Sequence, residues 1–266
     1  MNVLRYTFFA LAAILSMGAG LSLFADPASP ASANELASRL SGLREDGSSY
    51  VRLRMEIKGA APQTLQLQIK QRVTSSASEI LYQVLFPKER KGEAVLLRRT
   101  GNRAASGTLF TPPNTVRPIN DLKESLLGSD LSYEDIITNP YAWEHQAIVG
   151  NETIQGAPCQ ILESKPGSND HSTYASVRSW IDPRRMVPLR IEEYSGPGKL
   201  VRRIDTTRVV SEAGRHIPAD LIVQGTKQGS STVIDGSRIR HGVAYSDTDF
   251  TGDGMKDLSP PRGGAE

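Results

Sequence analysis

Residues with the chemistry for catalysis or metal binding are few in this chain and do not gather in motifs. The 4 histidines, His145, His171, His216 and His241, stand far apart, and none belongs to an H-E-x-x-H pattern that would hold zinc. Cys159, the only cysteine, cannot form an intramolecular disulfide, and its place in the alternating segment GAPCQIL predicts a buried structural thiol. No nucleophile elbow, phosphate-binding loop or dinucleotide fingerprint is present. We therefore expect no enzyme, no metal and no cofactor.

Three neighbouring carboxylates, Asp130, Glu134 and Asp135, are the best candidates for a general acid and base. Their position at the start of a short helical segment gives a simpler interpretation, in which they cap that segment and interact with its dipole. The stretch RRIDTTR at residues 202–208 is basic and could be taken for a phosphate-binding patch. Its composition favours an ordinary solvated strand face.

The acidic C-terminal stretch comes near the spacing of a calcium loop, but Pro260 occupies the position that should supply a bidentate glutamate. We expect Phe250 and Leu258 to pack this stretch onto the rest of the fold, and residues 259–266 to form a disordered tail. The whole chain carries 31 basic and 29 acidic residues, a net charge of +2. That balance argues against a nucleic-acid partner.

The N-terminal residues have the pattern of a secretory signal peptide. Arg5 precedes an apolar run over residues 6–24, and the A-x-A sequence ending at Ala33 offers a cleavage site, with Ala25 as an alternative. We predict a cleavable signal peptide over residues 1–33 and export of the mature chain across a membrane. The alternative is an uncleaved membrane anchor, because the apolar run approaches the length of a span.

After this segment, residues 35–43 repeat leucine at helical spacing and predict a short amphipathic helix. Alternation of apolar and polar residues then takes over. Residues 50–58 and 65–69 read as an antiparallel hairpin, residues 79–86 as a third strand, and residues 93–98 as a fourth that is buried on both faces. Further strands are predicted over residues 143–149, 157–164, 176–182, 187–194, 200–210, 216–224, 230–234 and 239–245. The last two are separated by the turn signal Asp235-Gly236.

A helical insert interrupts these strands after Pro112 and Pro113. Asp121 is placed to cap a helix over residues 122–127, which Gly128 would end. Ser132 and Asp135 have the spacing of a capping box for a second short helix. The apolar face of the insert, residues 121–137, must lie over the sheet, so we predict that it acts as a lid. A disulfide that tethers it to the sheet is expected to block exchange of any cargo.

An antiparallel sheet of about ten strands has to curl to bury its apolar face. The predicted fold is therefore mainly β (α+β): over residues 34–258, a strongly curved antiparallel sheet forms a half-barrel, with a few short helices covering its concave apolar face. Such a sheet encloses an apolar space that either takes a hydrophobic ligand or is filled by its own side chains. The candidate ligand-binding residues are Val51, Leu53, Met55, Ile57, Leu65, Leu67, Ile69, Ile80, Tyr82, Val84, Phe86, Leu122 and Leu126.

Several segments resemble the LolA-like outer-membrane lipoprotein-sorting proteins, in an uncharacterised branch of that superfamily. The most specific is LLGSDLSYEDI at residues 126–136; FPKERKGEAVLLRR (86–99), LFTPPNTVRPI (109–119) and the segment 174–203 add weaker support. The resemblance implies a half-barrel with an apolar cavity between sheet and helices. It also implies transport of lipoprotein acyl chains across the periplasm, in some members alongside membrane transporters of the resistance-nodulation-division (RND) type. It brings no catalytic residues.

The sequence thus predicts a monomeric periplasmic carrier or chaperone that binds a lipid or lipoprotein acyl chain and moves it toward the outer membrane. An inner-membrane RND-type or ABC transporter is the expected membrane partner. The alternative is a periplasmic adaptor that docks on an RND-type transporter and has a filled core without cargo. A hydrolase built on the curved sheet is a third hypothesis, against which the lack of a nucleophile motif counts.

Overall fold

The computed structural model describes residues 32–44, 47–74, 76–101, 103–212, 214–226 and 229–261. The chain separates into two units, Met1–Ala31 and Ser32–Glu266, and the described residues all belong to the second. The signal peptide predicted over residues 1–33 lies almost wholly outside them, as do residues 262–266 of the predicted tail. Both remain predictions.

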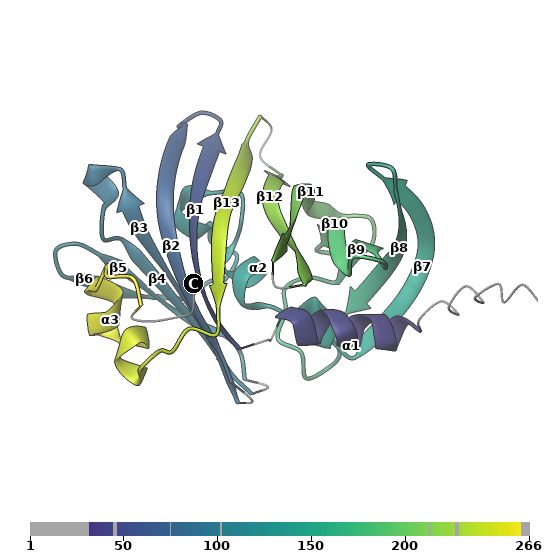
Figure 1. Ribbon diagram of the computed structural model, residues 1–266, viewed down its shortest axis with the longest axis horizontal. Helices are drawn as coiled ribbons and strands as arrows, with labels where there is room; N and C mark the ends of the chain where they lie inside the picture. Colours follow the sequence, from purple (N-terminus) through teal and green to yellow (C-terminus); the bar gives the residue numbers. More distant parts are fainter. Residues whose placement is uncertain are drawn as a thin grey trace, which may run out of the picture. The chain divides into compact units, whose positions relative to one another are not determined.

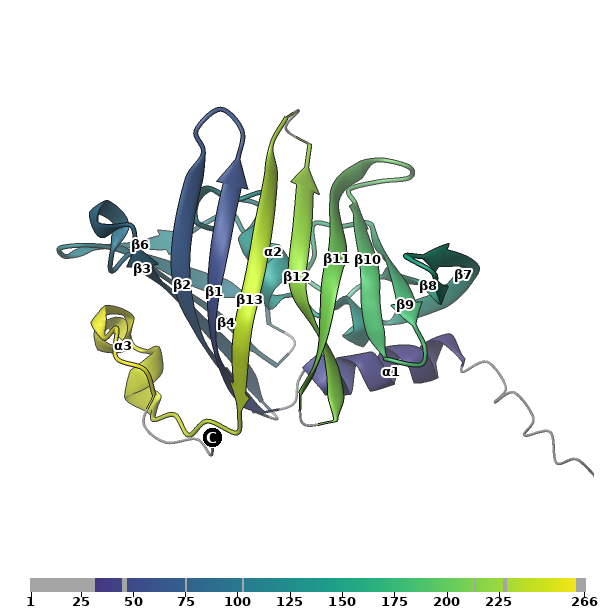
Figure 2. The same ribbon diagram turned by 45° about the horizontal axis from the view of Figure 1, so that its top comes forward.

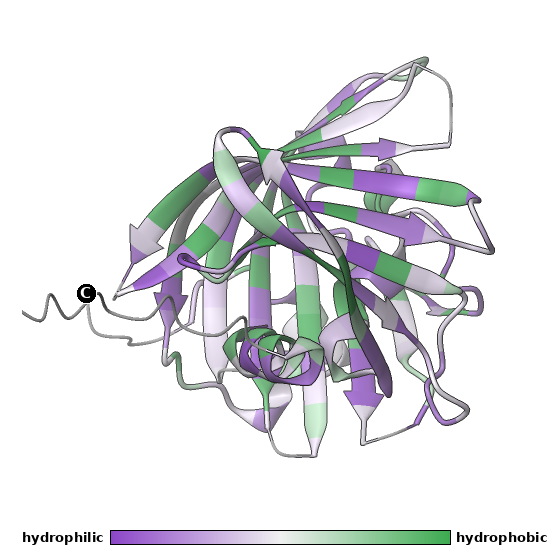
Figure 3. Ribbon diagram, turned by 90° about the vertical axis from the view of Figure 1, so that its right-hand side faces the viewer, coloured by the Kyte–Doolittle hydropathy of each residue, from purple (hydrophilic) through white to green (hydrophobic). Residues whose placement is uncertain are grey.

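The described residues form one curved, unclosed antiparallel sheet of 13 strands, as the alternation predicted (Figures 1 and 2). The strands are β1 (Ser48–Lys58), β2 (Gln63–Val73), β3 (Ala77–Phe86), β4 (Ala94–Thr100), β5 (Ser106–Thr111), β6 (Thr115–Ile119), β7 (His145–Ile154), β8 (Ala157–Lys165), β9 (Ser176–Asp182), β10 (Val187–Tyr194), β11 (Leu200–Glu212), β12 (Arg215–Gly225) and β13 (Ser231–His241). Figure 3 shows hydrophilic and hydrophobic residues alternating along them, which gives the sheet one apolar face.

The strand order is β6-β5-β4-β3-β2-β1-β13-β12-β11-β10-β9-β8-β7. Each half of the sheet therefore runs in sequence order, and the pair β1–β13 joins the two halves. The edge strands β6 and β7 follow each other in the sequence, so the connection over residues 120–144 has to pass from one edge to the other. It does so on the concave side, and contains the short helices η2 (Leu126–Gly128), α2 (Tyr133–Ile137) and η3 (Pro140–Ala142) (Figure 1).

The remaining helices lie on both sides of the sheet. The predicted N-terminal helix is present as α1 (Ala33–Arg44), which turns Leu36, Ala37 and Leu40 inward (Figures 1 and 2). At the C-terminus, η4 (Asp247–Phe250) and α3 (Gly252–Lys256) pack on the convex side, while η1 (Lys88–Arg90) connects β3 to β4. Phe250 is fully buried there, as expected.

Strand β4 shows how the two faces differ. Val95 and Leu97 enter the concave core, while Ala94 and Leu96 pack with Phe250 on the convex side. All four consecutive residues are therefore buried, which confirms the prediction that this strand has no wet face. The polar side chains of Gln68 and Gln83, also on the convex side, bind backbone carbonyls of the C-terminal segment and hold it in place.

The insert on the concave side matches the prediction only in its second part. Ser132 Oγ accepts a hydrogen bond from Asp135 N at 3.3 Å, and Asp135 Oδ2 accepts one from Ser132 N at 2.6 Å, so the capping box is confirmed. The helix predicted over residues 122–127 is wrong: this stretch is a turn that leads into η2, with Leu127 at φ 53°. Leu126 and Leu127 are both buried, and the positive φ lets adjacent side chains reach the core where a regular helix would separate them.

The turn predicted at Asp235-Gly236 is also wrong, because residues 231–241 form the single strand β13. A Cβ atom on Gly236 would lie 2.6 Å from the carbonyl oxygen of Ala219 on β12. The opposite neighbour β1 shifts its register at Val51/Leu53, next to this point. Here glycine marks a close approach of two backbones inside a strand instead of a turn.

Replacing Gly236 with alanine is expected to lower the free energy of unfolding by about 1–3 kcal/mol, because the new methyl group forces β12 and β13 apart. Chemical denaturation measures the change. Gly196→Ala is the matched control: no atom lies within 4 Å of its Cβ position, and its effect should stay within about 0.5 kcal/mol. Equal stability of the two variants would show that β12 and β13 are not tightly packed at this point.

Candidate ligand-binding cavity

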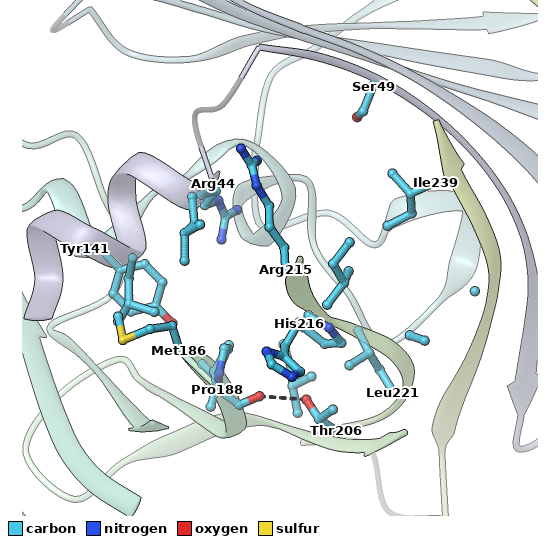
Figure 4. Close-up of a pocket in the computed structure, with 18 of the residues that line it drawn as sticks. Arg44, Ser49, Tyr141, Met186, Pro188, Thr206, Arg215, His216, Leu221 and Ile239 are labelled. Carbon is cyan, nitrogen blue, oxygen red and sulfur yellow. Dashed lines mark hydrogen bonds between the residues drawn. The ribbon is translucent and has the colours of Figure 1, made fainter. Parts of the chain in front are cut away.

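A cavity of about 990 Å³ lies on the concave side of the sheet, between the strands, α1 and the connection over residues 120–144 (Figure 4). Its wall is largely apolar. Among the side chains that line it are Ile191, Ile204, Leu221, Ile234 and Ile239, which come from four successive strands, β10 to β13. Alternation places these side chains on the concave face, in the central part of the sheet that follows β1 in the strand order.

The cavity exists because the connection fills only one half of the concave side. Leu126, Leu127 and Leu131 of the connection pack into the core formed by β1 to β4. On the side of β10 to β13, helix α1 crosses the space and brings Leu40 and Leu43 to its edge. A helix that bridges over the sheet leaves room that side chains from the strands do not fill.

The structure divides the thirteen predicted ligand-binding residues into three groups. Val51, Leu53, Ile69 and Tyr82 line the cavity, at its boundary with the neighbouring core, which they also contact. Those in the packed core beside it are Met55, Ile57, Leu65, Leu67, Ile80, Val84 and Leu126, with Leu122 partly buried against them. Phe86, at the end of β3, is 50% exposed and lies apart from both groups. The packed core that was the alternative is therefore present in one half of the fold, and ligand contact by the first four residues remains a prediction.

Sequence reasoning named no cavity residue from β10 to β13, although it predicted β10, β11 and β12 and, as two separate strands, most of β13. The signal was present, because Leu221 and Val223 alternate on β12 in the way that Leu65 and Leu67 do on β2. Alternation identifies the inward face of a strand. It does not reveal which inward faces the connection between β6 and β7 will cover.

The solvent-facing side of the cavity is basic. Its cationic and titratable lining residues are Arg39, Arg44, Arg184, Arg185, Arg215, His216 and His241. Arg44 Nη2 donates to the backbone oxygens of Asp135 and Ile136, at 3.3 Å and 3.2 Å. These carbonyls lie near the C-terminal end of α2, where a cation is favoured. Arg185 pairs with Asp182 at 2.6 Å.

A buried ion cluster forms another part of the wall. Arg202 Nη1 lies 2.8 Å from the Asp135 carboxylate and 2.9 Å from Glu193 Oε2, and it donates to the hydroxyl of Tyr174 at 2.7 Å. Its Nε donates to the backbone oxygen of Asp130 at 2.5 Å. Asp135, Tyr174 and Glu193 all line the cavity. The cluster therefore fixes the connection to β10 and β11.

Arg202 corrects the prediction of a solvated face for residues 202–208. Its side chain is only 13% exposed, whereas Arg203 and Arg208 reach solvent and pair with Asp205 and Asp220. The three predicted acid–base candidates have structural partners too: Asp135 in the capping box and the ion cluster, Glu134 with Ser172 and Thr173, and Asp130 with Ser230 and Thr232.

The pKa of Glu193 is raised well above its usual range, because burial penalises its charge and the Asp135 carboxylate lies beside it, while Arg202 opposes both effects. The pKa of Tyr174 is raised by burial and by the charges of Glu193 and Asp135. A protonated Glu193 leaves one carboxylate, Asp135, for the charge of Arg202. The cluster then adds little net charge to the cavity wall.

Glu193→Gln is expected to remove a component of stability that falls as pH rises. Unfolded glutamate ionises near pH 4.3, while the native carboxyl keeps its proton to a higher pH, so the native state binds more protons in this window. The wild type should lose stability relative to the variant between about pH 4.3 and the native pKa of Glu193. Urea denaturation at several values between about pH 4 and about pH 8 measures the difference in the free energy of unfolding between the wild type and the variant.

Glu163→Gln is a control of opposite sign. Burial of Glu163 favours its neutral form, but hydrogen bonds and charges from Lys165 and Arg178 lower its pKa overall. Its ionised form stabilises the native state above the unfolded pKa, and that contribution disappears as pH falls. Parallel pH profiles for the two variants would contradict the role given to Glu193.

Within the described residues, no group of three or more His, Cys, Asp or Glu side chains is arranged to hold a metal ion. Cys159 is buried, as predicted, and burial raises the pKa of its thiol. None of the helices in the described part of the chain has the length and apolar character of a membrane span.

The fold is similar to that of three crystal structures. A DUF1329 family protein from Desulfovibrio piger has a TM-score of 0.77 at 24% identity, over 84% of this chain and 97% of that one. A putative outer membrane lipoprotein-sorting protein domain from Vibrio parahaemolyticus scores 0.74 at 20% identity, over 85% and 98%. A LolA superfamily protein from Nitrosomonas europaea scores 0.66 at 20% identity, over 84% and 99%. No curated protein matches this chain.

The curved open sheet with its concave cavity is thus a LolA-like half-barrel, and the resemblance noted in the sequence is confirmed at the level of the fold. The model of a family described as "Uncharacterized protein" matches residues 77–257, more than half of the chain. The chain belongs to this family.

Proposed function

We propose that this protein is a periplasmic carrier that holds an acyl chain of a lipid or lipoprotein in the concave cavity. The observation that carries the proposal is the apolar space of about 990 Å³ enclosed by β10 to β13 and α1. Pockets of roughly 300–1,000 Å³ are the size that binds small molecules in proteins. The N-terminal sequence pattern supports export, and the printed names of two similar structures support a role in lipoprotein sorting.

Hydrophobic burial is sufficient to hold such a cargo. Each buried CH₂ group contributes about 0.8 kcal/mol, so a chain of about twelve carbons gains about 10 kcal/mol before the cost of association. The cavity wall therefore needs no fixed polar contact with the acyl chain. A carrier that depends on apolar burial can also release its cargo to a membrane, where the same burial is available.

The insert over residues 121–137 keeps its proposed role as a lid. Leu131, Asp135 and Ile136 lie on the cavity wall, while Leu126 and Leu127 anchor the other part of the insert in the core. Movement of the α2 end would then be enough to change access to the cavity. Proposed membrane partners are an RND-type or ABC transporter that supplies or receives the cargo.

The cavity favours the carrier over the adaptor with a filled core. Native mass spectrometry of the mature protein from a periplasmic extract, followed by organic extraction, tests the choice. A carrier should show a stoichiometric acyl-bearing adduct that extraction removes. A bare mass, with no uptake of added phospholipid or lipopeptide, would reject the carrier and leave the adaptor.

A further inference from the structure

Charge is distributed unevenly around the cavity. The whole chain is nearly neutral, at +2, yet five arginines line the cavity against two carboxylates, those of Asp135 and Glu193. Both carboxylates are held by Arg202, and the raised pKa of Glu193 reduces their charge further. Arg185 pairs with Asp182 at 2.6 Å. Neither of the two lining carboxylates is available to the arginines at the solvent-facing side, because Arg202 holds both.

Two of these arginines come together from distant parts of the sequence. Figures 1 and 2 both place the C-terminal end of α1 beside the start of β12, and Figure 4 shows Arg44 and Arg215 at the same end of the cavity. Arg44 is held by two backbone oxygens through Nη2. Among the described residues, no carboxylate lies within ion-pair distance of Arg44, Arg39 or Arg184. Cations gathered in this way favour the binding of an anion.

The arginines lie at one end of a space whose wall is apolar. Ile239 and Leu221 continue from Arg215 along the cavity in Figure 4, and the lining residues of β10 and β11 extend the same surface. A ligand that satisfies both parts needs an apolar chain and a negatively charged head. Guanidinium groups bind phosphate and carboxylate oxygens through paired N–H donors.

We infer that the cavity takes an amphiphile with an anionic headgroup, whose oxygens bind at Arg44 and Arg215 and whose chain lies along β10 to β13. This inference rests on the proposed carrier function and narrows it to a ligand class. Phosphate and carboxylate heads share the chemistry, so the test includes both.

The test compares amphiphiles with one dodecyl chain and different heads. Binding of dodecyl phosphate, dodecanoate and uncharged dodecyl maltoside is measured below their micelle concentrations by isothermal titration calorimetry. We expect the two anions to bind at least about tenfold more tightly than the maltoside, a preference that decreases as salt is added. Inorganic phosphate alone should bind far more weakly than dodecyl phosphate.

Variants assign the preference to the two arginines. Arg44→Gln with Arg215→Gln should remove the preference for the anions and leave maltoside binding unchanged, while the double lysine variant should keep part of it. Arg54→Gln is the control, because this exposed arginine of β1 pairs with Glu56 and does not line the cavity. Loss of maltoside binding in the glutamine variant would show a packing role for the arginines and overturn their assignment.

The other outcomes distinguish failure of the headgroup site from failure of the proposed carrier function. Equal binding of all three amphiphiles would overturn the headgroup site and keep the carrier. Binding of inorganic phosphate as tight as dodecyl phosphate would assign the arginines to a free anion. No binding of any amphiphile would reject the carrier itself.

Discussion

Replacing Leu221 with tryptophan is expected to weaken binding of a dodecyl amphiphile by at least about 100-fold. Leu221 points from β12 into the cavity, and the larger ring takes space from the ligand (Figure 4). If the ring displaces about four methylene groups of the chain, the loss is about 3 kcal/mol, which corresponds to roughly 100-fold in affinity. Calorimetric titration with dodecyl phosphate and dodecyl maltoside measures the effect.

Two further tryptophan variants make the result specific. Ile239→Trp fills the same cavity from β13 and should act in the same direction. Ile222→Trp is the matched control, because Ile222 is next to Leu221 on β12, does not line the cavity and alternates to the opposite face. A fold that is intact by circular dichroism with unchanged amphiphile affinity in both cavity variants would show that ligand binds elsewhere.

The second large effect is expected for Arg202→Met, which should lower the free energy of unfolding by about 3–5 kcal/mol. Methionine has a similar length but no charge, so Asp135 and Glu193 would remain buried without their cation. For a domain of this size the melting temperature should fall by about 10 °C. Thermal and urea denaturation measure the change.

Its control is the neighbouring residue on the same strand. Arg203 pairs with Asp205 at the surface, so Arg203→Met should cost at most about 1 kcal/mol. Above the native pKa of Glu193, where its carboxyl is ionised, adding Glu193→Gln to Arg202→Met should recover part of the stability, because one of the two orphaned carboxylates is then removed. A double variant no more stable than Arg202→Met at any pH up to about 8 would contradict a buried charge on Glu193 as a source of the instability.

Features set by a short stretch of sequence could be predicted well. The capping box of Ser132 and Asp135 depends on four consecutive residues and is present. Strand β4 was predicted to be buried on both faces from its uninterrupted apolar run, and the C-terminal segment with Phe250 supplies the second cover. In these places the local preference and the tertiary packing agree, so the sequence pattern is sufficient.

Features that depend on a distant backbone could not be predicted. Gly236 looks like a turn residue in the sequence, and its true role follows from Ala219 on the neighbouring strand. Leu127 breaks the helix predicted over residues 122–127, because the core formed by β1 to β4 draws two adjacent leucines inward. Arg202 lies in a basic polar stretch, but its partners come from β10 and from the connection on the concave side.

The location of the ligand-binding cavity also depends on packing between distant parts of the chain. The fold class and the existence of an apolar concave face follow from alternation alone. The location of the cavity does not, since it depends on where the connection between β6 and β7 packs. Val51 and Leu53 line the cavity while Met55 and Ile57 on the same strand lie in the packed core. All four residues contact the same core, but only Val51 and Leu53 also reach the cavity.

The β1–β13 pair also has a consequence for how the chain folds. In each half of the sheet, every strand pairs with a neighbour in sequence, so the hairpins form by closing short loops. The β1–β13 pair alone joins the first strand to the last, at the centre of the sheet. Folding rates fall as contacts become more distant in sequence, so this pairing should dominate the rate. A circularly permuted chain that began at β7 and ended at β6 would be a continuous meander of adjacent hairpins.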